Sequence, residues 1–122
     1  MLAILISEGE LHGYLLYKRI MEYTCMRWRP SIGTMYRTLN DMVKEGLVIK
    51  RSEGRRYSYV ITPKGIEYFI ENSKAPIMRM AGVLTKILEA YLKVPKEGSE
   101  VLTKELRRRL RSLREVLGRY DL

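Results

Sequence analysis

The chain has 122 residues, which suits one small domain with a helical extension. Its formal net charge is +9, and this excess of Lys and Arg favours a polyanionic partner. With one Cys, one His and no carboxylates at catalytic spacing, the sequence offers no disulfide framework, metal site, cofactor site or catalytic site, so we do not expect an enzyme. No apolar run reaches the ~18 residues of a membrane span and no leader opens the chain, so we expect a cytoplasmic protein that does not enter a membrane.

Two short helices are expected at the start of the chain. Residues 1–6 are apolar without a break and predict a buried helix that ends at the turn-rich residues 7–10. Residues 11–21 predict a second helix, whose apolar residues are only roughly periodic. Gly13 near its start permits a phosphate to approach exposed backbone amides, whereas the lone His12 is typical of a capping or packing residue.

A third helix is expected between Ser31, which can cap its start, and Gly46, which suits a left-handed residue at its end. One face is an apolar stripe: Ile32, Met35, Tyr36, Leu39, Met42 and Val43. The opposite face is short, polar or cationic: Gly33, Thr34, Arg37, Asn40, Asp41 and Lys44. Such a face can enter the major groove of DNA, and the alternative is the solvated side of an ordinary core helix.

The residues after Gly46 predict a β-hairpin, with strands at residues 47–50 and 56–61 and a turn at residues 51–55. Four cations cluster around this turn, against a single acid: Lys50, Arg51, Arg55 and Arg56. Contact with a phosphate backbone explains this cluster better than solubility does. The order of helix, hairpin and basic tip predicts a winged helix-turn-helix.

Helices are expected over the rest of the chain. Thr62 can cap a fourth helix over residues 63–72, and residues 73–76 predict a break after it. A long amphipathic helix then carries a stripe with heptad spacing: Ile77, Met80, Leu84, Ile87 and Tyr91. Beyond a linker at residues 94–98, Ser99 is expected to cap a last helix, whose apolar stripe includes Leu106, Leu110, Leu113 and Leu117.

These two stripes are too wide to cover each other fully beside so small a domain, so they predict a homodimer. The expected division is a DNA-binding domain at residues 1–73 and a helical dimerisation region at residues 76–122. The other face of the last helix is rich in arginine. It could bind nucleic acid or an anionic membrane, but a solvated face beside a leucine seam is the interpretation we favour from sequence.

Four segments of the first half, in this order and with sensible gaps, resemble the PadR family of transcriptional regulators: Glu10–Tyr14, Pro30–Leu39, Glu45–Val48 and Ile61–Gly65. The resemblance implies a winged-helix DNA-binding domain and a homodimer built by C-terminal helices. It also implies repression that is often relieved by a small aromatic ligand. The recognition role carries over to Ser31, Gly33, Thr34, Tyr36 and Arg37, and the wing role to the four cations of the hairpin.

The fold expected is therefore mainly α with a small β-hairpin wing (α+β), a winged helix-turn-helix followed by dimerisation helices. The function expected is a sequence-specific regulator of transcription that binds double-stranded DNA at a palindromic operator, as a homodimer and as a repressor. A non-specific or architectural DNA-binding protein is one alternative, which the high charge permits. A winged-helix module that binds protein is the other, and an acidic or apolar face would favour it.

Overall fold

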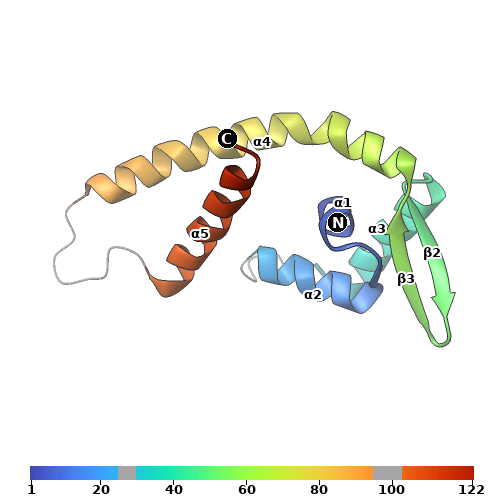
Figure 1. Cartoon of the computed structure of the whole chain (residues 1–122). Coiled ribbons are helices and arrows are strands. Elements are labelled where there is room, and N and C mark those ends of the chain that lie inside the picture. The colour runs from blue at the N-terminus through green and yellow to red at the C-terminus, as the bar shows by residue number, and fades with distance from the viewer. Residues whose placement is uncertain (25–29, 95–102) are drawn as a thin grey trace. The chain divides into compact units, whose positions relative to one another are not determined.

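The computed structural model describes residues 1–24, 30–94 and 103–122, and its parts form two units, Met1–Met78 and Arg79–Leu122 (Figure 1). The elements are α1 (Leu2–Glu8), β1 (Leu11–His12), α2 (Gly13–Tyr23), α3 (Ile32–Lys44), β2 (Val48–Glu53), β3 (Arg56–Ile61), α4 (Pro63–Lys93) and α5 (Lys104–Arg119). The first unit holds α1 to α3, the sheet and the start of α4. This is the predicted winged helix, and the expected fold class is confirmed.

The sheet is antiparallel with the strand order β1-β3-β2, so β3 lies in its middle. The turn lies within the predicted residues 51–55 but is shorter, because β2 extends to Glu53 and the chain reverses at Gly54, whose positive φ of 64° suits a glycine. The predicted start of the second helix is wrong. Leu11 and His12 are extended and pair with the free edge of β3, so α2 begins at Gly13.

The core of the first unit lies between its helices and the sheet, where α1 packs on β3 and α3 on β2. The side chains that are almost fully buried include Leu5, Leu16, Met35, Leu39, Val48 and Tyr59. Met35 and Leu39 confirm the predicted apolar stripe of α3. Ile32 was placed on the same stripe but is 47% exposed, because it is the first residue of α3 and lies where the helix passes beyond the core.

The end of α3 is joined to the start of α4 by a set of short contacts. Gly46 has the predicted left-handed conformation, with φ of 78°, and its carbonyl accepts a hydrogen bond of 2.6 Å from the Thr62 hydroxyl. The Thr62 hydroxyl also accepts from the amide of Gly65 at 3.0 Å, which confirms Thr62 as the cap of α4. A Cβ on Gly65 would lie 2.2 Å from the carbonyl oxygen of Leu47, so only glycine fits there. These contacts fix the end of α3 against the start of α4.

Helix α4 continues through Pro76, so the predicted break at residues 73–76 is wrong. Proline removes one backbone hydrogen bond, which leaves the carbonyl of Asn72 without its helical donor. Asn72 is exposed, so solvent can satisfy that carbonyl and the helix continues. The expected division at residues 73 and 76 stays a prediction. Ser99 lies outside the described residues, and the described start of α5 is capped by Thr103, whose hydroxyl accepts from the amide of Leu106 at 3.1 Å.

Candidate nucleic-acid interface

The first turn of α3 is held in place by its cap. The Ser31 hydroxyl accepts a hydrogen bond of 3.1 Å from the amide of Thr34 and lies 2.8 Å from the Thr34 hydroxyl. The predicted cap at Ser31 is therefore confirmed. Both side chains are exposed but engaged with each other, so the pair presents a small, pre-organised polar surface at the start of the helix.

The face of α3 opposite the core is open along its length. Gly33, Arg37, Asn40 and Lys44 follow one another at intervals of three or four residues and are all exposed. A Cβ on Gly33 would meet nothing within 4 Å, so this glycine leaves the surface low rather than avoiding a clash. Ile32 adds an exposed apolar side chain beside this face. Sequence periodicity missed it, because periodicity alone does not show where the core ends.

A cleft of about 570 Å³ lies between the start of α2, helix α3 and the tip of the wing. Its walls are aromatic and cationic: His12, Gly13, Tyr14, Leu15, Lys18, Tyr36, Arg55, Arg56 and Tyr57. The structure thus brings Tyr36 of the predicted recognition helix together with Arg55 and Arg56 of the predicted wing. Sequence reasoning missed Lys18, although its position one helical turn after Tyr14 placed both on one face of α2.

Gly13 lets α2 and α3 approach each other at this cleft. A Cβ on Gly13 would lie 2.8 Å from both the hydroxyl oxygen and Cε1 of Tyr36. The Tyr36 ring is half-buried and its hydroxyl lies at the first turn of α2, where backbone amides have no helical acceptor. Tyr36 therefore shapes the cleft. Burial raises the pKa of the Tyr59 phenol above its ordinary value, so Tyr59 stays neutral.

The four predicted wing cations divide into two groups. Arg55 and Arg56 are exposed, line the cleft and form no ion pair with any described residue. Lys50 lies with its Nζ 4.0 Å from the centroid of the Tyr57 ring, which is a cation–π contact. Arg51 follows Lys50 in the same strand and therefore points to the other face of the sheet, which it shares with its partner Ser58 and with Arg56.

On that opposite face Arg51 belongs to a polar network. Its guanidinium lies 3.6 Å from the carboxylate of Glu10, which also accepts a hydrogen bond of 2.5 Å from the buried Ser58 hydroxyl. His12 Nε2 lies 3.9 Å from the Glu53 carboxylate, while His12 Nδ1 is buried without a hydrogen-bond partner in the described part of the chain. These contacts link the segment before α2 to the wing. Arg51 is thus engaged by Glu10, whereas Arg55 and Arg56 line the cleft.

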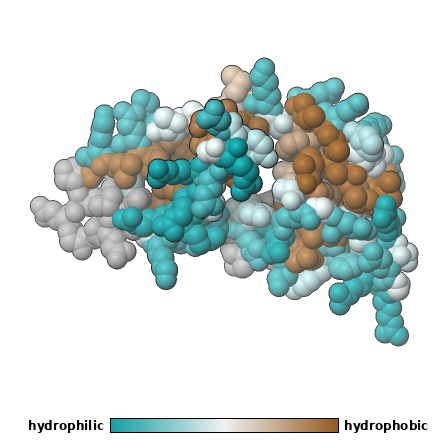
Figure 2. Space-filling view, in the orientation of Figure 1, coloured by the Kyte–Doolittle hydropathy of each residue, from teal (hydrophilic) through white to brown (hydrophobic). Residues whose placement is uncertain are grey.

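The residues predicted to form a dimer interface are largely exposed (Figure 2). In α4 the exposed fractions are 61% for Ile77, 71% for Met80, 39% for Leu84, 61% for Ile87 and 39% for Tyr91. In α5, Leu106 and Leu110 are half-buried, whereas Leu113 and Leu117 are 41% and 39% exposed. Each helix thus carries an uncovered apolar stripe.

Two features are absent from residues 1–24, 30–94 and 103–122. No three His, Cys, Asp or Glu side chains in these ranges come together as metal ligands could. None of the described helices combines the length and the apolar character needed to span a bilayer.

Similar proteins are found by sequence and by structure. YqjI of Escherichia coli (strain K12), named as a transcriptional regulator, is 32% identical over 69 residues, which cover 56% of this chain and 33% of YqjI. MJ0944 of Methanocaldococcus jannaschii is 34% identical over 86 residues, 60% of this chain and 65% of that protein. The chain therefore spans about one third to two thirds of the length of these curated relatives.

A solved structure of a transcriptional regulator from Clostridium thermocellum Cth-833 is similar with a TM-score of 0.53 and 28% identity, over 75% of this chain and 85% of that one. The transcriptional regulator PadR-like family matches residues 1–71, which include α1 to α3, the sheet and the start of α4. The chain therefore belongs to the PadR-like family of transcriptional regulators.

Proposed function

We propose that the protein regulates transcription by binding double-stranded DNA at a specific sequence, as a homodimer that represses its target. The observation that carries the proposal is the pairing of an exposed polar helix face with a cationic cleft. Helix α3 offers Arg37 and Asn40 to solvent and also contributes Tyr36 to the cleft that Arg55 and Arg56 line. An acidic or apolar surface would favour a protein partner instead, and this surface is polar and cationic.

In this proposal α3 reads bases. Its first turn is low at Gly33 and carries the Thr34 hydroxyl, so it can approach base edges closely. Arg37 can donate two hydrogen bonds to a guanine, Asn40 can pair with an adenine, and Ile32 can contact a thymine methyl group. Lys44, near the end of α3, lies where a backbone phosphate would pass.

The cleft would hold the DNA backbone. Arg55, Arg56 and Lys18 supply three cations, and the first turn of α2 adds amides at the positive end of the helix dipole. Phosphate contacts of this kind set the register of the protein on the duplex without reading its sequence. Specificity is therefore assigned to α3 and affinity to the cleft.

Dimerisation is proposed from the uncovered stripes of α4 and α5. A two-fold dimer places two recognition helices in successive major grooves, about 34 Å apart, and so requires a palindromic operator. Repression, and its relief by a small aromatic ligand, are proposed from the family resemblance alone.

The experiment that tests this proposal is selection of bound sequences from a random duplex pool with the purified protein. We expect a palindromic consensus. Arg37→Ala should weaken binding to the selected operator by about 1–3 kcal/mol and reduce the preference over random DNA. Lys74→Ala is the matched control, because Lys74 is an exposed cation of the first unit outside the interface.

Two results would contradict the proposal. Equal affinity for selected and random duplexes would leave an architectural DNA-binding protein, since backbone contacts alone give no discrimination. If the protein bound no duplex at all, the remaining interpretation would be a winged-helix module that binds protein.

A further inference from the structure

Helix α5 carries far more positive than negative charge. Between Lys104 and Arg119 it has seven Lys and Arg residues against two Glu. Four of these cations recur at intervals of three and four residues and so share one face, which we call the basic stripe: Lys104, Arg107, Arg111 and Arg114. All four are exposed.

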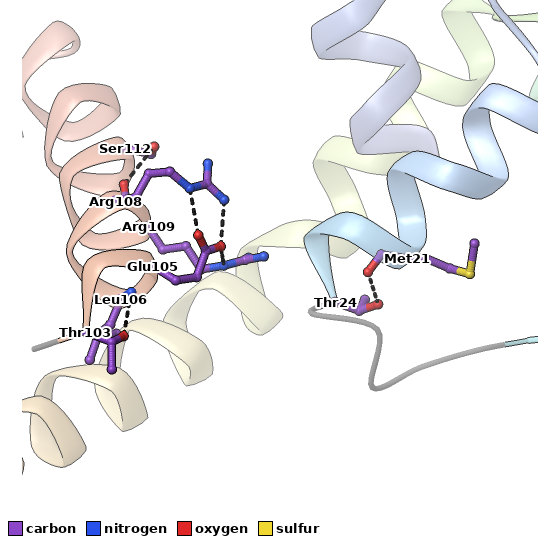
Figure 3. A network of polar contacts seen from close by, with 8 residues as sticks. All are labelled: Met21, Thr24, Thr103, Glu105, Leu106, Arg108, Arg109 and Ser112. Atoms are coloured by element: carbon purple, nitrogen blue, oxygen red, sulfur yellow. Dashed lines mark hydrogen bonds and ion pairs between the residues drawn. The ribbon is translucent and has the colours of Figure 1, made fainter.

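The cations of the basic stripe are not neutralised within the described chain. None of the four side chains forms an ion pair with a described residue, whereas Arg108 and Arg109 both bind Glu105, at 2.7 and 2.9 Å (Figure 3). Glu105 is thus committed to Arg108, which borders the stripe, and to Arg109, which lies on another side of the helix. The helix sorts its arginines into a paired group and an unpaired group, which a generally solubilising surface would not require.

The basic stripe is also distinct from the apolar stripe of α5. At 3.6 residues per turn, Leu106, Leu113 and Leu117 lie on a different side of the helix from Arg107 and Arg111. The two stripes meet at Leu110, in a shallow groove of about 210 Å³ that Arg107, Arg111 and Arg114 also line. A second copy that covers the leucines would therefore leave the arginines open to another partner.

We propose that the basic stripe is a second DNA-binding surface, which contacts backbone phosphates without reading sequence. The argument is charge complementarity: planar guanidinium groups bind phosphate oxygens through two parallel hydrogen bonds. An anionic membrane is the other polyanion to consider. It suits the helix less well, because a membrane-surface helix must insert its apolar face, and the proposed dimer occupies that face. The inference rests on the DNA-binding function proposed above.

Two triple variants of α5 with the same change in charge test this inference. Arg107→Gln, Arg111→Gln and Arg114→Gln remove three stripe cations, whereas the control removes three arginines outside the stripe: Arg108→Gln, Arg109→Gln and Arg119→Gln. Arginine and glutamine have similar helix propensities, so both variants should keep the helix content and oligomeric state of the wild-type protein. Circular dichroism and sedimentation equilibrium check this.

The readout is the salt dependence of affinity for the selected operator and for a random duplex. We expect the stripe variant to bind both at least tenfold more weakly at about 0.1 M salt. The slope of log K against log salt should fall by at least about two units, since each phosphate contact contributes about 0.9. The control should change the slope by less than about one unit.

Three outcomes would overturn the inference. Equal losses of DNA affinity in the stripe variant and in the control would show that only the total charge of α5 matters. If the stripe variant lost binding to phosphatidylserine vesicles but kept its DNA binding, the basic stripe would be a membrane-binding surface. A wild-type protein that binds no duplex would overturn both this inference and the proposed function, whereas the first two outcomes leave the proposed function standing.

Discussion

The two units of the chain differ in how far their apolar side chains are buried. In Met1–Met78 the helices and the sheet enclose a core in which Leu16 and Leu39 are completely buried. In α5 no residue is buried, and Leu113 and Leu117 are about two-fifths exposed. All these helices are amphipathic, so the difference lies in what surrounds them. The first unit closes its own core, while the second leaves its apolar stripes exposed.

The largest expected effect comes from breaking the second unit with Leu84→Asp and Ile87→Asp. Cutting either side chain to Ala at a dimer interface would cost about 2–5 kcal/mol, and a buried carboxylate costs more. We expect a monomer or an unfolded chain that no longer binds a palindrome tightly. Sedimentation equilibrium measures the mass, and circular dichroism shows whether the chain is folded.

The matched control adds two carboxylates to the other side of α4, as Gly82→Asp and Thr85→Asp. A Cβ on Gly82 meets nothing within 4 Å, so this variant should stay dimeric. A wild-type protein that is monomeric at micromolar concentration would contradict both the dimer and the palindrome.

The next effect compares one glycine from each unit. Gly65→Ala should destabilise the first unit by about 1–3 kcal/mol, because its Cβ would lie 2.2 Å from the Leu47 carbonyl oxygen in a closed core. Gly82→Ala has open space and should stabilise α4 by up to about 1 kcal/mol. Denaturant unfolding of both variants measures the change, and a neutral Gly65→Ala would mean that the first unit is less tightly packed than described.

A smaller effect is expected in the wing. Replacing Arg55 and Arg56 with Ala should lower the salt slope by about one unit for each lost phosphate contact and weaken cognate and random DNA alike. Lys74→Ala with Arg79→Ala removes two exposed cations of α4 as the control. Salt titrations of binding give the slopes. An altered sequence preference with an unchanged slope would show instead that the wing reads bases.

Much of the first unit could be predicted from sequence, because local signals and the fold agree there. The cap at Ser31, the left-handed Gly46 and the cap at Thr62 are all in place. The short strand at Leu11 and His12 could not be predicted, because its partner lies about 47 residues later in β3. The break before Pro76 was wrong, because an exposed helix tolerates a missing backbone hydrogen bond.

The candidate site was predicted by residue type but not by grouping. Sequence placed Arg51 with Arg55 and Arg56, whereas the structure pairs Arg51 with the Glu10 carboxylate and leaves Arg55 and Arg56 to line the cleft. Lys18 was missed, because only the fold brings α2 to the wing. A cluster of charged residues in a sequence can therefore indicate a function, but the fold is needed to show which of these residues perform it.

The smallest expected effect concerns Glu105, in the first turn of α5. Hydrogen bonds from Arg108 and then Arg109 lower the pKa of this carboxyl from 4.5 to about 2. Because the folded pKa lies below the ordinary value, the contribution to stability is complete above pH 4.5 and is lost as the pH falls towards 2. The group is exposed, so the change in stability should be slight and the carboxyl titration followed by NMR is the better measurement.

In that titration, Arg108→Gln with Arg109→Gln should return the midpoint towards 4.5, whereas Arg111→Gln with Arg114→Gln should leave it near 2. A wild-type midpoint near 4.5 would mean that Arg108 and Arg109 are as free as the basic stripe. The sorting of arginines on α5 would then disappear. There would then be no reason to expect that one side of this helix, rather than its total charge, determines DNA binding.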